Sequence, residues 1–116
     1  MERSYRLRSP TDFRRVRREG KSYAHPLVVL VASPNQMATS RFGVTTSRSF
    51  RKATERNRAK RRLRHALQPF LDEVEPGWDF VVIARRPILT APWPDLKEAL
   101  ITLFNQAGAA GKQGSS

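Results

Sequence analysis

The basic side chains between residues 48 and 64 are the strongest chemical signal in the sequence. This segment holds nine Lys or Arg residues and one acidic residue, a net charge of +8 out of +12 for the whole chain. On a helix, Arg56, Lys60 and Arg64 recur every fourth residue and form one row. Like charges at this spacing repel one another by about 0.2–0.5 kcal/mol per pair, so stability alone does not favour them. The row therefore indicates a polyanionic partner, and a nucleic acid is the first candidate.

The remaining composition excludes several classes of protein. A chain of 116 residues suffices for one domain, and the lack of Cys rules out disulfides, thiolate nucleophiles and Cys-ligated metal sites. The acidic residues are scattered except at positions 72–75, a cluster typical of a solvated turn and not of a catalytic carboxylate pair. The longest apolar run, residues 27–32, is too short to cross a bilayer, and the sequence shows no secretory signal. We therefore expect a cytoplasmic protein without a membrane partner.

Local signals predict the elements that precede the basic segment. Ser9 and Pro10 indicate the start of a helix, and Gly20 indicates its end. Residues 22–33 are rich in Val and Leu and are predicted to form a strand. Residues 41–47 alternate between apolar and polar side chains, and we expect them to be the antiparallel partner of that strand.

The second half of the sequence predicts two helices and one buried strand. Apolar residues recur at helical spacing from about residue 53 to 70, which gives the basic segment a core-facing stripe. Residues 79–85 are almost entirely apolar, as in a central strand. A second amphipathic helix covers residues 96–107 and ends at Gly108.

These elements predict a single α+β domain over residues 1–107, followed by a disordered tail over residues 108–116. The order α-β-β-α-β-α gives a small, mostly antiparallel sheet of about four strands, including one possible further short strand. We expect the helices to pack on one face of this sheet. Such an architecture is similar to that of small ribosomal proteins.

Four segments of the sequence occur in a characteristic order and spacing. They are Leu7 to Phe13 with Gly20-Lys21, then Phe42-Gly43-Val44, then Arg56-Asn57-Arg58 followed by Lys60 to Arg64, and finally Asp79 to Arg85. Together they resemble the bacterial ribonuclease P protein subunit over residues 7 to about 106.

The resemblance implies the protein subunit of an RNA-dependent endonuclease that removes the 5′ leader of precursor tRNA by hydrolysing one phosphodiester bond. It implies that the catalytic centre and its Mg²⁺ ions lie in the RNA subunit, so that the protein supplies no catalytic residue and no metal ligand. The expected partners are the RNA subunit and precursor tRNA, and DNA is not expected. The side chains expected to bind RNA are those of Arg48, Lys52, Arg56, Asn57, Arg58, Lys60, Arg61, Arg62 and Arg64.

A single-stranded leader requires aromatic surfaces as well as cations, because its bases have no pairing partners. We expect Phe13 and Tyr23 to meet at one edge of the sheet, beside Arg14, Arg17 and Lys21. For Phe13, a place in the core is an equal alternative.

Other nucleic-acid or membrane functions fit the sequence less well. A ribosomal or other structural RNA-binding protein without a catalytic role would show the same charge and a similar fold, and it is the main alternative. A DNA-binding regulator is disfavoured because the basic helix has no helix-turn-helix partner. A membrane-surface helix would need free apolar side chains, and the core requires those of this helix.

Overall fold

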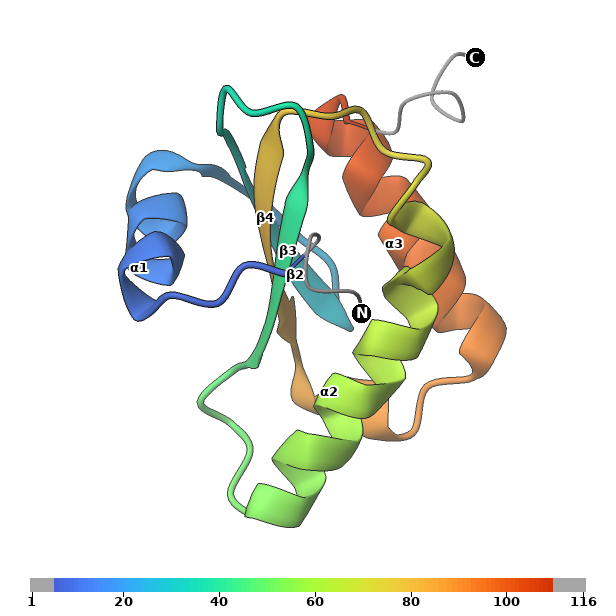
Figure 1. Cartoon of the computed structure of the whole chain (residues 1–116). Helices are drawn as coiled ribbons and strands as arrows, with labels where there is room; N and C mark the ends of the chain where they lie inside the picture. The colour runs from blue at the N-terminus through green and yellow to red at the C-terminus, as the bar shows by residue number, and fades with distance from the viewer. Residues whose placement is uncertain (1–5, 110–116) are drawn as a thin grey trace.

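The computed structural model of the chain describes residues 6–109 (Figure 1). Its elements follow in the order α1 (Pro10–Glu19), β1 (Lys21–Ala24), β2 (Val28–Pro34), β3 (Arg41–Thr46), α2 (Ala53–Leu67), the 3₁₀ turn η2 (Gln68–Phe70), β4 (Trp78–Ala84), the 3₁₀ turn η3 (Arg86–Leu89) and α3 (Trp93–Ala107).

The four strands form one mixed sheet in the order β1-β2-β4-β3. β1 pairs with β2 and β2 with β4 in antiparallel fashion, whereas β3 runs parallel to β4. The α+β class, the mostly antiparallel sheet and the interior position of β4 are thus confirmed. The prediction that residues 41–47 pair with the first strand is wrong, because β2 already has β1 on one side and β4 on the other. The helical connection through α2 brings the chain back parallel to β3 and next to it.

The predicted strand over residues 22–33 is a hairpin of two strands. Pro26 lies in its turn, where a residue without an N–H group does no harm. Nδ1 of His25 accepts a hydrogen bond from the N–H of Leu27 at 3.1 Å and fixes this turn. β1 is the further short strand that the sequence allowed.

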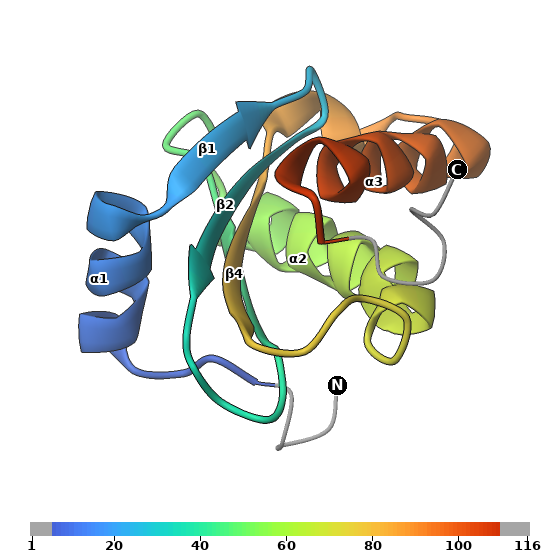
Figure 2. The same ribbon diagram turned by 90° about the horizontal axis from the view of Figure 1, so that it is seen from above.

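Helices cover both faces of the sheet, which corrects the expectation of one covered face (Figure 2). α2 and α3 pack over the larger core on one face. α1 packs on the other face against Val31, Val81 and Ile83. The reason lies in the strands, since neighbouring residues such as Leu30 and Val31 of β2 are both buried although they point to opposite faces. A strand that is apolar on both faces needs cover on both.

α1 rests on the sheet through a small apolar contact. The hydroxyl of Ser9 accepts a hydrogen bond from the N–H of Thr11 and caps the helix at the predicted residue. Val16 is the one fully buried residue of α1. The half-buried ring of Phe13 packs on Gly43 of β3.

The chain is ordered beyond the predicted end of the domain. α3 ends at Gly108, whose φ of 73° is the left-handed conformation that glycine favours. Ala109 is buried, and its carbonyl accepts the N–H of Glu75 at 3.1 Å. Residues 110–116 of the predicted tail lie outside the described residues.

Candidate nucleic-acid interface

α2 buries one stripe of its surface and turns its charged residues outward. Ala59, Leu63, Ala66 and Leu67 lie in the core, as the spacing predicted. All the predicted RNA-binding residues of the helix stay exposed or half-exposed: Arg56, Asn57, Arg58, Lys60, Arg61, Arg62 and Arg64. Arg48 and Lys52 are exposed in the connection from β3 to α2.

Arg62 differs from the other basic residues of α2. Its Nη2 atom donates to the carbonyl of Ala91, and its guanidinium lies 5.9 Å from the ring centre of Trp93 at the start of α3. Its Nε atom is buried without a hydrogen-bond partner in the described part of the chain. Arg62 therefore connects α2 to α3, a role that the charge pattern did not reveal.

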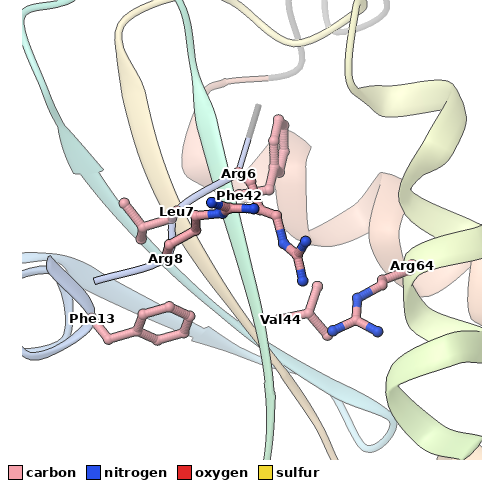
Figure 3. Close-up of a pocket in the computed structure, with 7 residues that line it drawn as sticks. All are labelled: Arg6, Leu7, Arg8, Phe13, Phe42, Val44 and Arg64. Carbon is pink, nitrogen blue, oxygen red and sulfur yellow. The ribbon is translucent and has the colours of Figure 1, made fainter. Parts of the chain in front are cut away.

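A pocket of about 370 Å³ wraps the outer edge of β3, and we call it the edge pocket (Figure 3). The N-terminal segment follows this edge, since the N–H of Leu7 donates to the carbonyl of Phe42 at 2.9 Å. Phe13 lies on one side of β3 and Arg64 on the other (Figure 3). The residues that line the pocket are Arg6, Leu7, Arg8, Phe13, Phe42, Val44 and Arg64, three of which are cationic.

A second opening lies on the face of the sheet that α1 covers only in part, and we call it the sheet groove. It has a volume of about 600 Å³ and an apolar floor formed by Val29, Val31 and Ile83. Arg17 of α1 and Arg48 of the connection from β3 to α2 stand at its rim. An apolar floor between two guanidinium groups suits unpaired bases joined by phosphates.

The two openings meet along α1. Phe13 lines the edge pocket and Arg17 lines the sheet groove, and residues four apart are neighbours on one side of a helix. Arg64 in the edge pocket and Arg48 at the groove rim connect both openings to the basic surface of α2 and the connection before it. The cations of both openings thus lie around the outer edge and the end of β3, and we call them the basic path.

The predicted leader-binding residues are split between the two faces of the sheet. Tyr23 pairs in register with Leu30 and packs against the core under α3, and Lys21, two residues earlier, points to the same face. Phe13, Arg14 and Arg17 lie on α1, on the opposite face. The expectation that Phe13 and Tyr23 meet at one edge is wrong, because β1 and β3 are the two opposite edges of the sheet.

A buried carboxylate fixes α1 to the ends of three strands. Asp79 of β4 has no exposed surface. It accepts hydrogen bonds from Nε and Nη2 of Arg41 at 2.9 and 2.8 Å, from Nδ2 of Asn35 at 2.8 Å, and from Nη2 of Arg15 on α1. Asp12 of α1 lies 3.5 Å from Arg15 and 3.8 Å from Arg41. We call Asp12, Arg15, Arg41 and Asp79 the charge cluster.

The hydrogen bonds around Asp79 favour the charged forms of this carboxylate and of its two arginine partners, Arg15 and Arg41. Burial opposes ionisation of Asp79, but the donors of Arg41, Asn35 and Arg15 outweigh it and hold the pKa of Asp79 below its ordinary value. The hydrogen bonds to Asp79 raise the pKa of Arg15 and Arg41 in turn. The two positive and two negative charges of the cluster cancel, so these arginines add little to the basic path.

Comparison with known proteins agrees with this geometry. Residues 1–108 match the sequence profile of the ribonuclease P family. The chain is 44% identical over 107 residues to the ribonuclease P protein component of Herpetosiphon aurantiacus. This match covers 92% of this chain and 87% of that protein. The chain belongs to the ribonuclease P protein family.

Solved structures of ribonuclease P proteins have the same fold. The protein from Thermotoga maritima is 33% identical, with a TM-score of 0.73, and the match covers 84% of this chain and 93% of that one. The protein from Staphylococcus aureus is 25% identical, with a TM-score of 0.78, and the match covers 92% of this chain and 98% of that one. Family membership makes this chain the protein subunit of the ribonucleoprotein that matures tRNA 5′ ends, an endoribonuclease whose catalysis is carried out by RNA.

The described residues of this ribonuclease P protein hold no group of three or more His, Asp or Glu side chains placed to bind a metal ion. Within residues 6–109, no helix is both long and apolar enough to span a membrane.

Two groups of residues in the interface were missed by sequence reasoning. Arg6 and Arg8 flank Leu7, an alternation typical of a short strand that pairs with an edge, and this was the available signal. Val29 and Val31 alternate along β2 with residues that face the larger core, but the pattern gives no hint of which face of the sheet stays partly open. That depends on how far α1 extends over the sheet.

Proposed function

We propose that α2 and the connection before it bind the RNA subunit of ribonuclease P. The residues assigned to this contact are Arg48, Lys52, Arg56, Asn57, Arg58, Lys60, Arg61 and Arg64. The proposal is carried by one observation: the six of these side chains that belong to α2 gather on the outer face of a helix whose inner face is buried in the core, and Arg48 and Lys52 are exposed just before it. A helix held in this way presents its cations at fixed spacing, so they can neutralise successive phosphates of a folded RNA. Arg62 is left out, because α3 holds its guanidinium.

The substrate in this proposal is precursor tRNA, with its single-stranded 5′ leader lying along α1. The apolar floor of the sheet groove accepts bases, and Arg17 with Arg14 contacts the phosphates on either side. The exposed part of the Phe13 ring offers a stacking surface where the groove passes into the edge pocket. Lys21 and Tyr23 are not part of this path, since they lie on the α3 face of the sheet.

The Mg²⁺ ions of the reaction are assigned to the RNA subunit. Hydrolysis of a phosphodiester bond is assisted by divalent ions that hold the attacking and leaving oxygens. The openings of the protein are lined by guanidinium groups, which repel cations and attract the phosphates of the substrate. The protein thus holds the precursor while the RNA carries out the reaction, and we place this activity in the cytoplasm.

The test is cleavage of a leader-bearing precursor tRNA by a bacterial ribonuclease P RNA at a Mg²⁺ concentration where the RNA alone is nearly inactive. Addition of the protein should restore 5′ cleavage, and the protein alone should cleave nothing. The double variant Arg61→Ala, Arg64→Ala should need a higher protein concentration for the same rate.

The matched control is the double variant Arg85→Ala, Lys97→Ala, which removes the same charge from two exposed positions, one directly after β4 and one on α3. It should behave like the parent protein. Equal losses in both double variants would mean that net charge alone, and not the α2 surface, attracts the RNA, and would overturn the proposal.

A further inference from the structure

Asp79 lies at the centre of a polar connection between α1 and the body of the domain. Its two oxygens receive hydrogen bonds from Arg41, at the start of β3, and from Arg15 of α1. Asn35, in the connection from β2 to β3, contacts the same carboxylate at 2.8 Å. The carboxylate is buried and lies in neither the edge pocket nor the sheet groove.

Arg15 and Arg17 lie on opposite flanks of α1. They are two residues apart, which is roughly 200° around the helix axis. Arg15 reaches into the charge cluster, whereas Arg17 stands at the rim of the sheet groove. A rotation of α1 that released Arg15 from Asp79 would therefore also move Arg17, together with Phe13 on the neighbouring face.

The apolar contact beneath α1 is too small to fix this rotation by itself. Val16 is the one fully buried side chain of the helix and packs on a few aliphatic residues of the sheet, and beside it the half-buried ring of Phe13 packs on Gly43. Aliphatic contacts tolerate sliding, whereas forked hydrogen bonds from guanidinium groups to a carboxylate define both distance and direction. Buried charged groups can select one arrangement of a fold in this way.

We propose that Asp79 is a positioning residue that acts through Arg15 and Arg41 to set the orientation of α1, and so the shape of the sheet groove and the edge pocket that receive the leader. This inference rests on the proposed function of those two openings. It assigns their geometry to a carboxylate that itself touches no RNA.

The orientation of α1 can be measured directly because the chain contains no cysteine. Glu19→Cys and Gln68→Cys place two thiols at exposed positions, one at the end of α1 and one just after α2. Nitroxide labels on both thiols give the distribution of distances between the two helices by pulsed electron resonance. The measurement is made on the full chain, alone and assembled with a ribonuclease P RNA.

Four variants are compared in the labelled and the unlabelled protein. Arg15→Gln removes the connection from α1, and Asp79→Asn removes the negative charge and replaces one of the two accepting oxygens by an amide group that donates. Arg18→Gln is the matched control, since it removes the same charge from the same helix at a position that is 71% exposed and pairs only with neighbouring Glu19 in the described residues. Arg15→Lys keeps the charge but not the planar guanidinium, whose Nη2 atom donates to both Asp79 and Asp12.

Arg15→Gln is expected to broaden or shift the distance distribution while the circular dichroism spectrum stays that of the folded protein. The ratio of affinities for leader-bearing precursor and mature tRNA should fall about fivefold or more. Affinity for the RNA subunit should not change, Arg18→Gln should behave as the parent protein, and Arg15→Lys should recover part of the loss. Asp79→Asn should change the label distances and the leader discrimination in the same direction. If this variant does not fold, the result for Arg15→Gln decides whether the positioning role holds.

An unchanged distance distribution in Arg15→Gln, or unchanged leader discrimination in that folded variant, would overturn the positioning role. If the proposed function is wrong, the parent protein itself will show no leader discrimination. The distances between the labels will still show whether Asp79 sets the orientation of α1.

Discussion

The ring of Phe13 lies so close to Gly43 that a Cβ atom at position 43 would be 2.4 Å from its Cζ atom. Real Cβ atoms essentially never approach another atom this closely, so the Phe13 ring can lie where it does only because position 43 of β3 is a glycine. The contact joins Phe13 of α1, which is proposed to stack on the leader, to β3, around whose outer edge the basic path lies.

Gly43→Ala should therefore force the Phe13 ring out of its place. Overpacking of this kind costs about 1–3 kcal/mol in the free energy of unfolding, measurable by urea denaturation, and leader discrimination should fall with it. In a Phe13→Ala background the same substitution should cost much less, because there is no ring to displace. An equal cost in both backgrounds would locate the effect in β3 itself.

Phe13→Ala and Tyr23→Ala should have different consequences, because the two rings lie on opposite faces of the sheet. Stacking of a base on an aromatic ring is worth about 1–3 kcal/mol, so Phe13→Ala should weaken binding of leader-bearing precursor about tenfold and leave mature tRNA almost unaffected. Tyr23→Ala should lower the melting temperature without changing leader discrimination. Titrations with both RNAs, beside thermal melts, separate these patterns; a leader-specific loss in a Tyr23→Ala protein with a normal melting temperature would contradict the assignment.

The parts of this fold that local chemistry determines could be predicted from the sequence. α1 begins after Ser9 and ends before Gly20, as these two residues predicted. The apolar stripe of α2 indicated which of its residues stay outside the core. The partner of β3 could not be predicted in this way, because it depends on which strand edge is free after β1 and β4 have paired with β2.

The same limit explains the errors at the site. Whether Tyr23 faces α1 or α3 depends on its register with Leu30, and a shift of one residue would reverse it. The role of Asp79 was hidden because its partners come from three other parts of the chain. Residues that come together only in the folded chain show no recognisable pattern in the sequence around any one of them.

The affinity of the protein for the RNA subunit should fall steeply with salt concentration. Each phosphate neutralised contributes about −0.7 to −0.9 to the slope of log affinity against log salt. Arg61→Ala combined with Arg64→Ala should reduce the magnitude of that slope by about 1.4 to 1.8. Filter-binding titrations at several salt concentrations measure it, with Arg85→Ala, Lys97→Ala as the charge-matched control. A slope that is the same in both double variants would show that Arg61 and Arg64 do not contact phosphates.

Arg62→Ala should affect stability and not RNA binding, in contrast to Arg61→Ala one residue earlier. The cation–π contact with Trp93 is worth about 0.5–1 kcal/mol, and the buried stem of Arg62 adds packing between α2 and α3. Urea denaturation should show this loss, and in a Trp93→Ala background the loss should be smaller. The salt slope for RNA binding should equal that of the parent protein; a reduced slope would return Arg62 to the RNA contact.

Acid should unfold the protein partly through Asp79. In the unfolded chain this carboxyl takes up its proton near its ordinary pKa of 3.8, whereas the hydrogen bonds of the charge cluster lower its pKa in the folded protein. The unfolded state therefore binds more protons in the interval between the two values, so the free energy of unfolding falls as the pH is lowered from about 4 through the folded pKa. Above that interval the contribution is fully present.

Asp79→Asn should be less stable than the parent at neutral pH by about 3 kcal/mol, since it breaks a buried ion pair, and the difference should shrink as the pH falls. Urea denaturation at a series of pH values measures both effects. Asp95→Asn, the same change at an exposed position of α3, should retain the acid dependence of the parent; a constant difference between Asp79→Asn and the parent at every pH would mean that the ionisation of Asp79 does not contribute to stability.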